Sequence, residues 1–188
     1  MIMTKITKQN HKYPLGQEPN FIVPKTYQPY RYVLGHYGEK MLVVLGMNPS
    51  KAQAGVSDAT VNTIIRRSMM LDDYDGWATI SIYPERATNA SDLDPLNERL
   101  IEGNIKAIRT FVREYHVTEV WGAWGVPKQQ QLLRGRDAVL DLFREEHVSV
   151  YGYAKLKSGN PHHPLYLSFK DAQRFEYDLS YSNAELFE

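Results

Sequence analysis

Hydrophobic residues in this chain form short continuous runs separated by longer segments with helical periodicity. The clearest run is Met41 to Gly46, and an unbroken apolar run of this length predicts a strand covered on both faces of a sheet. Similar runs at 77–83, 117–121 and 148–153 predict three further strands. An alternating pattern from Tyr30 to Tyr37 predicts one more.

The connection between the first two of these strands is short. Gly38, Glu39 and Lys40 read as a turn that leads directly into the run at residue 41. We therefore expect residues 30–37 to form a β-hairpin that feeds the buried strand 41–46.

Helical spacing of apolar residues predicts three helices between the strands. The first begins near residue 58, with Ser57 or Asp58 as its N-cap. The second begins at the cap-then-proline pair Asp94-Pro95, and the third spans about 127–146. Residues 170–188 are acidic and aromatic, which predicts a closing helix followed by a frayed tail.

Strands that alternate with helices predict parallel strands joined by right-handed crossovers. We expect a three-layer α/β/α fold with a four-stranded, mainly parallel sheet of order 2-1-3-4, in which strand one is 41–46, plus an N-terminal hairpin strand. Residues 1–26 are polar and proline-containing, and they predict an extended N-terminal arm before a single α/β domain at 27–188. Whether the arm packs on the domain is left open.

Composition narrows the possible functions. The 188 residues include no cysteine, which excludes disulfides, a thiolate nucleophile and thiolate metal ligands. Because no His-x-x-x-His or carboxylate cluster is visible, we expect no metal site and no cofactor. Lys plus Arg equals Asp plus Glu at 22 each, so a polyanionic partner would need a local basic patch. Apolar runs are too short for a membrane span or a signal peptide, which favours a cytoplasmic protein.

Candidate catalytic residues follow the predicted strand ends, where loops and helix N-termini of an open parallel sheet form the ligand crevice. Asn48 precedes a proline, which restrains it and could aim its amide into the site, although a simple turn is the alternative. His163 could supply a donor, an acid or a cation. His162 points to the opposite side and is more simply a solvated loop residue. Asp58, with Thr60, is either a helix cap or a general base for water.

Basic and aromatic residues occur at the same strand ends. Together Lys51, Arg86 and Lys157 would make a crevice suited to a phosphate or a nucleotide. The rings of Trp124 and Tyr83 could stack on a base, but both could instead fill the core, and core filling is the favoured interpretation of Tyr83.

Five motifs follow one another along the chain: Met47-Asn48-Pro49-Ser50, Ser57-Asp58-Ala59-Thr60, Arg86-Ala87-Thr88, Trp121-Gly122-Ala123-Trp124-Gly125 and Lys157-Ser158-Gly159-Asn160-Pro161-His162-His163-Pro164-Leu165-Tyr166. Taken together in this order, over about residues 30–168, they resemble the family catalogued as domain of unknown function 1643. The resemblance implies an architecture more than an activity.

The order of the motifs is also similar, more distantly, to the uracil-DNA glycosylase superfamily. By that likeness, the turn 46–50 with Asn48 would position water, and His163-Pro164 would stabilise the leaving base and grip a DNA backbone. Ser81 stands where relatives often carry an asparagine that would read the base, and the turn at 46–50 lacks the acid of the fastest glycosylases.

Two functional hypotheses follow. The first is a glycosylase-like hydrolase or binder that acts on a nucleobase in nucleic acid, in DNA for example, or in a nucleotide. The second is a non-catalytic module on the same fold that binds a nucleotide or another protein. The sequence does not identify such a protein partner. The expected catalytic residues are Asn48, His163 and Asp58, and the expected substrate-binding residues are Ser50, Lys51, Thr60, Ser81, Tyr83, Arg86, Trp124, Lys157 and His162.

Overall fold

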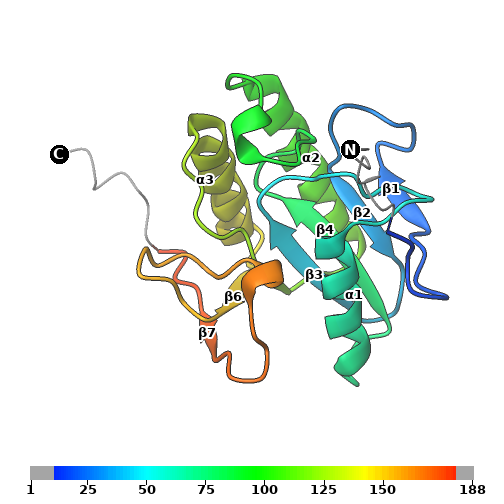
Figure 1. Ribbon diagram of the computed structural model, residues 1–188. Coiled ribbons are helices and arrows are strands. Elements are labelled where there is room, and N and C mark those ends of the chain that lie inside the picture. Colours follow the sequence, from blue (N-terminus) through cyan, green and yellow to red (C-terminus); the bar gives the residue numbers. More distant parts are fainter. Residues whose placement is uncertain (1–10, 181–188) are drawn as a thin grey trace, which may run out of the picture.

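A computed structural model describes residues 11–180 as a mixed α/β fold built on a single seven-stranded sheet of order β1-β2-β4-β3-β5-β6-β7 (Figure 1). β3 pairs in parallel with β4 and β5, and β5 pairs in parallel with β6. The outer strands β1, β2 and β7 pair antiparallel. The strands are β1 Phe21–Val23, β2 Val33–His36, β3 Met41–Gly46, β4 Gly76–Ser81, β5 Glu119–Gly122, β6 Ser149–Tyr153 and β7 Arg174–Glu176.

The sheet is larger than the four strands and one hairpin strand that the sequence predicts. The four apolar runs do lie next to one another, as β4-β3-β5-β6. The short strands β1 and β7 extend the two edges. Three residues are too few for an alternating pattern to stand out, because strand recognition needs alternation over about four to eight residues.

The prediction of a β-hairpin between residues 30–37 and 41–46 is wrong. β2 pairs with β4, so β4 lies between β2 and β3. The carboxylate of Asp75 accepts hydrogen bonds from the backbone N–H groups of Glu39 and Lys40, at 3.0 and 2.7 Å. The connection therefore crosses the start of β4. Both edges of the fully apolar β3 can then be covered by parallel strands.

Three α-helices lie within the described residues, and their starts differ in part from the prediction. For the first helix, the N-cap Asp58 is confirmed, since its Oδ1 accepts from the Val61 N–H at 2.9 Å. The second helix begins after Asn97, which caps it, and not at Asp94-Pro95. The helices are α1 Ala59–Met70, α2 Glu98–Glu114 and α3 Gln130–Glu145, with short 3₁₀ turns η1 at Ala90–Asp92 and η2 at Pro164–Tyr166.

The closing helix expected within 170–188 is not present in its described part. Residues 170–180 contain β7 instead, and residues 181–188 lie outside the described residues. Within residues 11–180, no helix is both long enough and apolar enough to cross a membrane.

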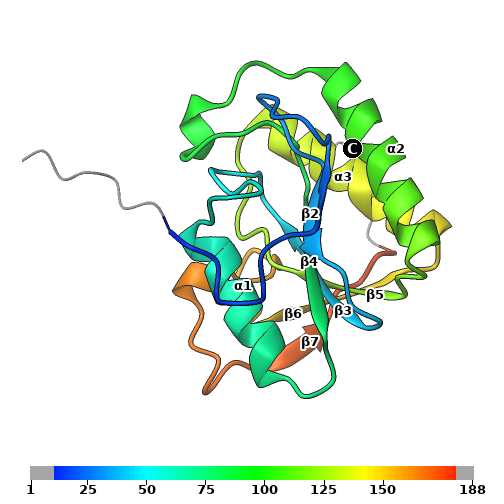
Figure 2. The ribbon, with the colours of Figure 1, turned by 90° about the vertical axis from the view of Figure 1, so that its right-hand side faces the viewer.

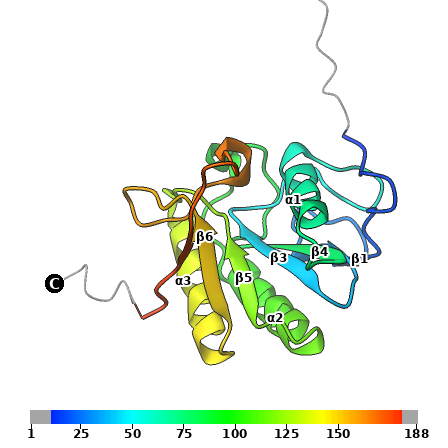
Figure 3. The same ribbon diagram turned by 90° about the horizontal axis from the view of Figure 1, so that it is seen from below.

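Helices cover both faces of the sheet, with α1 on one side and α2 and α3 on the other (Figure 3). Alternate residues of β3 follow these faces: Val43 and Leu45 pack in the core shared with α2 and α3, whereas Leu42 and Val44 pack with Ile64 of α1. From β3 the chain continues to β4 on one side of it, and the later strands β5 and β6 lie on the other side. The carboxyl ends of β3 and β5 therefore form a topological switch point.

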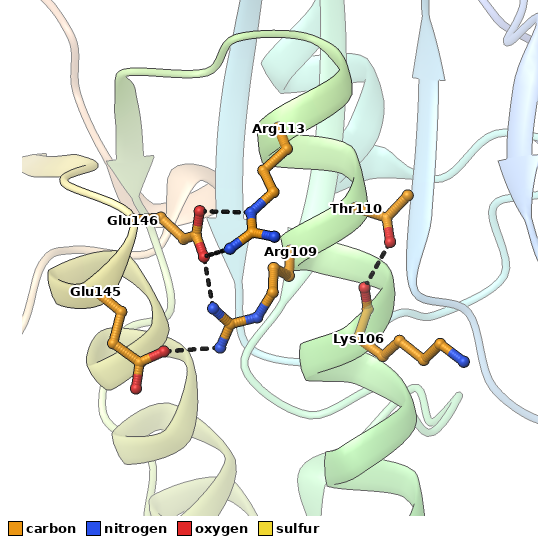
Figure 4. A network of polar contacts seen from close by, with 6 residues as sticks. All are labelled: Lys106, Arg109, Thr110, Arg113, Glu145 and Glu146. Atoms are coloured by element: carbon orange, nitrogen blue, oxygen red, sulfur yellow. Dashed lines mark hydrogen bonds and ion pairs between the residues drawn. The ribbon is translucent and has the colours of Figure 1, made fainter.

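A network of ion pairs joins the ends of α2 and α3 (Figure 4). Glu146 accepts from Arg113 at 2.8 Å and also pairs with Arg109, which donates to Glu145 at 2.7 Å. Hydrogen bonds from Arg113, then from Arg109, hold the pKa of the Glu146 carboxyl below its ordinary value. Because these groups are near the surface, we expect a modest contribution to stability. The network lies at the edge of the sheet where the parallel strands begin, away from the switch point.

The described part of the N-terminal stretch packs alongside α1 before it enters the sheet as β1 (Figure 2). The Ser57 N–H donates to the His11 carbonyl at 2.8 Å, and the Asn62 side chain donates to the Lys12 carbonyl at 2.9 Å. The ring of Tyr13 is buried and stacks on Trp77, with ring centroids 6.1 Å apart. Residues 11–23 therefore belong to the packed structure, a point on which the sequence alone is silent.

Candidate functional site

An outer crevice of about 540 Å³ opens where the parallel strands end. Its volume is within the range of roughly 300–1,000 Å³ that is typical of small-molecule sites. Loops that follow β3, β4, β5 and β6 supply its walls, together with the N-terminus of α1. Of the expected site residues, those that line it are Asn48, Ser50, Lys51, Asp58, Thr60, Trp124, His162 and His163.

Asn48 follows β3 with its side-chain amide fixed by main-chain carbonyls. The Nδ2 group donates to the Ala87 carbonyl at 2.9 Å and, with longer contacts, to those of Pro49 and Glu85. This network fixes which end of the amide is nitrogen, because only the nitrogen can donate to a carbonyl. No described residue donates to Asn48 Oδ1. That oxygen is thus free to accept a hydrogen bond from water or from a ligand hydroxyl.

The imidazole of His163 is held in one neutral tautomer. Its Nδ1 accepts a hydrogen bond from the Leu165 N–H at 3.3 Å at the start of η2. Burial lowers the pKa of His163 below its ordinary value of 6.5, and the neighbouring His162 lowers this pKa further. The ring is therefore neutral at pH 7, with its proton on Nε2. The Nε2–H group of His163 is therefore a hydrogen-bond donor on an uncharged ring.

The lowered pKa of His163 predicts a loss of stability in acid. Since the folded-state pKa lies below that of the unfolded chain, the unfolded chain binds more protons below about pH 6.5, and acidification favours unfolding. We expect the free energy of unfolding, measured with urea, to fall less in His163→Gln than in the wild type between about pH 7.5 and about pH 5.5.

The matched control for this measurement is His116→Asn. His116 is exposed and has a φ of 50°, which asparagine also accepts. This variant should lose as much stability as the wild type over the same interval. An equal loss in His163→Gln and the wild type would contradict the assignment.

Asp58 acts as a helix cap in the structure. Its Oδ1 accepts from the Val61 N–H at 2.9 Å, and its Oδ2 accepts from the Ala52 N–H at 3.3 Å. Both oxygens are therefore already bound to the main chain. Thr60, in the first turn of α1, also lines the crevice. The carboxylate therefore joins the start of α1 to the loop at residue 52, which is the helix-capping role that the sequence offers as the alternative to a general base.

Of the expected basic residues, Lys51 lines the crevice, whereas Arg86 and Lys157 do not. Arg86 donates to the carbonyls of Gln28 at 3.1 Å, Ser50 at 3.1 Å and Ala52 at 2.9 Å. Its guanidinium thus braces the loop that carries Asn48. Lys157 is exposed to solvent. A wide basic crevice is not what the structure forms.

The expected stacking residues are buried. Trp124 lines the crevice but is 0% exposed, and its Nε1 donates to the Asn160 side chain at 2.9 Å. Tyr83 is 0% exposed, accepts from the Asn97 N–H and fills the core. The ring available at the mouth is Tyr166, which is 77% exposed and has its centroid 5.5 Å from that of His163. Its position two residues after His-Pro could have marked it.

A second, inner cavity of about 60 Å³ lies next to the crevice, and Asn48 and His163 line both. Ser81 contributes to the inner cavity. So does Arg31, which is 4% exposed and was not expected as a site residue. In the sequence, Arg31 is marked only as a charged residue near the start of the alternating pattern at residues 30–37, which includes β2. No group of three or more His, Asp or Glu residues in the described chain is arranged to hold a metal ion.

The sheet and its crevice define an α/β protein whose candidate site is built from the loops that follow the parallel strands at a topological switch point. The profile of the family described as "Protein of unknown function (DUF1643)" matches residues 31–165, and the chain belongs to this family. The matched region begins at Arg31 and includes both Asn48 and His163. No protein with a curated description matches the chain, and no solved structure matches it.

Proposed function

We propose that the crevice binds a nucleobase, carried by a nucleotide or a nucleic acid, and hydrolyses its N-glycosidic bond. The observation that carries this proposal is the pairing of a free acceptor, Asn48 Oδ1, with a neutral donor, His163 Nε2–H, on the walls of one cavity. The distant likeness to uracil-DNA glycosylases assigns the same two positions to water and to the leaving base.

In this reaction the oxygen of a water molecule bonds to the sugar C1′, and the C1′–N bond breaks with its electron pair leaving on the base. Asn48 Oδ1 accepts a hydrogen bond from the water and orients it. His163 Nε2–H donates to the base as negative charge develops there, which stabilises the departing group without protonating it fully. The proton released by the water passes to solvent.

Among the described residues that line the crevice, Asp58 is the one carboxylate, and both of its oxygens accept main-chain hydrogen bonds, Oδ1 from the Val61 N–H and Oδ2 from the Ala52 N–H. Water is then oriented by an amide that cannot take its proton, so we expect slow hydrolysis. The same observation favours the second candidate function, in which the crevice binds a nucleotide without cleaving it.

The mouth of the crevice carries the groups that would meet the rest of a substrate. Leu165 and Tyr166 are 43% and 77% exposed, and Lys51 stands at the same rim. Exposed apolar and aromatic side chains of this kind can stack on an unpaired base, and the lysine can contact a phosphate.

Base release tests the proposal directly. The protein is incubated with nucleotides and with single-stranded and duplex oligonucleotides that carry one uracil, hypoxanthine or mismatched base, and free base is measured by chromatography. We expect slow release of one class of base. Binding of a nucleotide without release would support the second candidate, whereas neither release nor binding would overturn both. If DNA is the ligand, its affinity should fall with salt according to the number of phosphates contacted.

A further inference from the structure

Arg31 carries a guanidinium that is buried without an anionic partner. The residue is 4% exposed, and its Nη1 donates to the Ala52 carbonyl at 2.6 Å. Among the described residues, no acceptor meets its Nε or Nη2, and no carboxylate forms an ion pair with it. A guanidinium has five N–H donors in a planar fork, so most of its hydrogen-bonding capacity is unused.

The surroundings of Arg31 make its charge costly. Burial, followed by repulsion from Arg86, lowers the pKa of Arg31 to about 10, so the group remains a cation at pH 7. Arg86 donates to the same Ala52 carbonyl at 2.9 Å, and two cations therefore meet at one oxygen. Asp58 attracts both, but among the described residues neither arginine forms an ion pair with it. A buried charge is normally paired, since an unpaired one forfeits its hydration.

The inner cavity supplies the space that a partner for Arg31 would need. Its volume of about 60 Å³ is room on the order of four water molecules. A single phosphate group suits this volume, whereas a nucleobase requires the larger outer crevice. Arg31 shares the lining of this space with the hydroxyl-bearing residues Ser50, Thr60, Thr79 and Ser81 and with the carboxylate of Asp58. The two neighbouring guanidinium groups of Arg31 and Arg86 outnumber the one negative charge of Asp58. Ser50 and Thr60 also line the outer crevice.

We propose that the inner cavity is a binding subsite for one oxyanion, a phosphate group, with Arg31 as its counter-charge. The guanidinium fork offers paired N–H donors to two phosphate oxygens, and the hydroxyls of Ser50, Thr60 and Ser81 donate to the others. The Thr79 hydroxyl donates to the Leu34 carbonyl. This inference rests on the proposed function in one respect only, which is that the phosphate is carried by a nucleoside whose base occupies the outer crevice. Free inorganic phosphate presents the same chemistry.

Calorimetric titration tests the subsite with inorganic phosphate at an ionic strength matched with potassium chloride. Wild-type protein should bind phosphate, and Arg31→Gln should weaken this binding by about tenfold or more. The matched control is Arg99→Gln, since Arg99 is exposed on α2 and lines neither cavity. It should bind as the wild type does. Equal affinity in all three proteins, or no phosphate binding by the wild type, would overturn the proposal.

Ser81→Val keeps the test decisive if Arg31→Gln does not fold. Ser81 is buried in β4 and lines the inner cavity, so valine should fit the strand and fill the space while Arg31 stays in place. Phosphate affinity should again fall, and unchanged affinity would overturn the subsite.

A nucleoside and its 5′-monophosphate, titrated in parallel, separate the two proposals. Arg31-dependent binding of phosphate with no binding of any nucleoside supports the subsite and overturns the nucleobase crevice. Equal affinity for the nucleoside and its monophosphate supports the crevice and overturns the subsite.

Discussion

His163→Ala and Asn48→Ala should each slow base release by about 10²- to 10³-fold, because each removes a hydrogen bond made to the reacting groups. The His163 variant removes the only donor of the proposed pair, and the Asn48 variant removes the acceptor that orients water. The rate is measured under single-turnover conditions with saturating protein, so that weaker ligand binding does not enter the result.

The control for these rates is His116→Asn, which removes a histidine far from the crevice and should leave the rate unchanged. The Asn48→Ala and His163→Ala variants must also retain the wild-type circular dichroism spectrum, since Asn48 joins the loop after β3 to the Ala87 carbonyl. A folded His163→Ala protein that releases base at the wild-type rate would remove His163 from the mechanism.

Gly135→Ala should lower the free energy of unfolding by about 2 kcal/mol, although alanine is the better helix former. A Cβ at Gly135 of α3 would lie 2.2 Å from the Ile82 carbonyl oxygen and 3.5 Å from the Tyr83 Cβ. The backbone that leads from β4 toward the site must then move. Thermal unfolding should show the melting temperature falling by about 4–8 °C.

Gly103→Ala is the matched control in a neighbouring helix. The nearest atom to its Cβ would be the Tyr32 hydroxyl at 2.5 Å, the far end of a half-buried side chain that can move aside. We expect stability within about 0.5 kcal/mol of the wild type or a gain of up to about 1 kcal/mol from helix propensity. If both alanine variants were equally stabilised, the close approach of α3 to the end of β4 would be refuted.

The interior of the fold follows from the sequence because its signals are local. Apolar runs mark β3 to β6, and the side chain of Asp58 marks the start of α1. The pairing of β2 with β4 does not follow, since it joins residues far apart in the chain. The bonds from the Glu39 and Lys40 N–H groups to the Asp75 carboxylate are also long-range and leave no local signal. Short edge strands such as β7 carry too few residues to show a period.

The candidate site was predictable only to the level of the sheet edge. The motifs around Asn48 and His163 place both residues at one crevice. A position at a strand end does not reveal which way its side chain points. The sequence therefore could not show that Tyr83 points into the core or that Arg86 points toward loop carbonyls. Arg31 gave no motif, because its significance comes from burial without a partner, which is a tertiary property.

The most direct test of the central claim is ligand-induced stabilisation of the wild type, Asn48→Ala and His163→Ala by nucleobases, nucleotides and short oligonucleotides. A ligand that binds only the folded state stabilises it by RT ln(1 + L/Kd), where L is the ligand concentration, so the melting temperature rises with the logarithm of that concentration once it exceeds the dissociation constant. We predict a shift for at least one nucleobase-containing compound in the wild type, with a much smaller shift in both variants. An undiminished shift in both variants, or no shift with any compound in the wild type, would contradict the claim that Asn48 and His163 bind one ligand in this crevice.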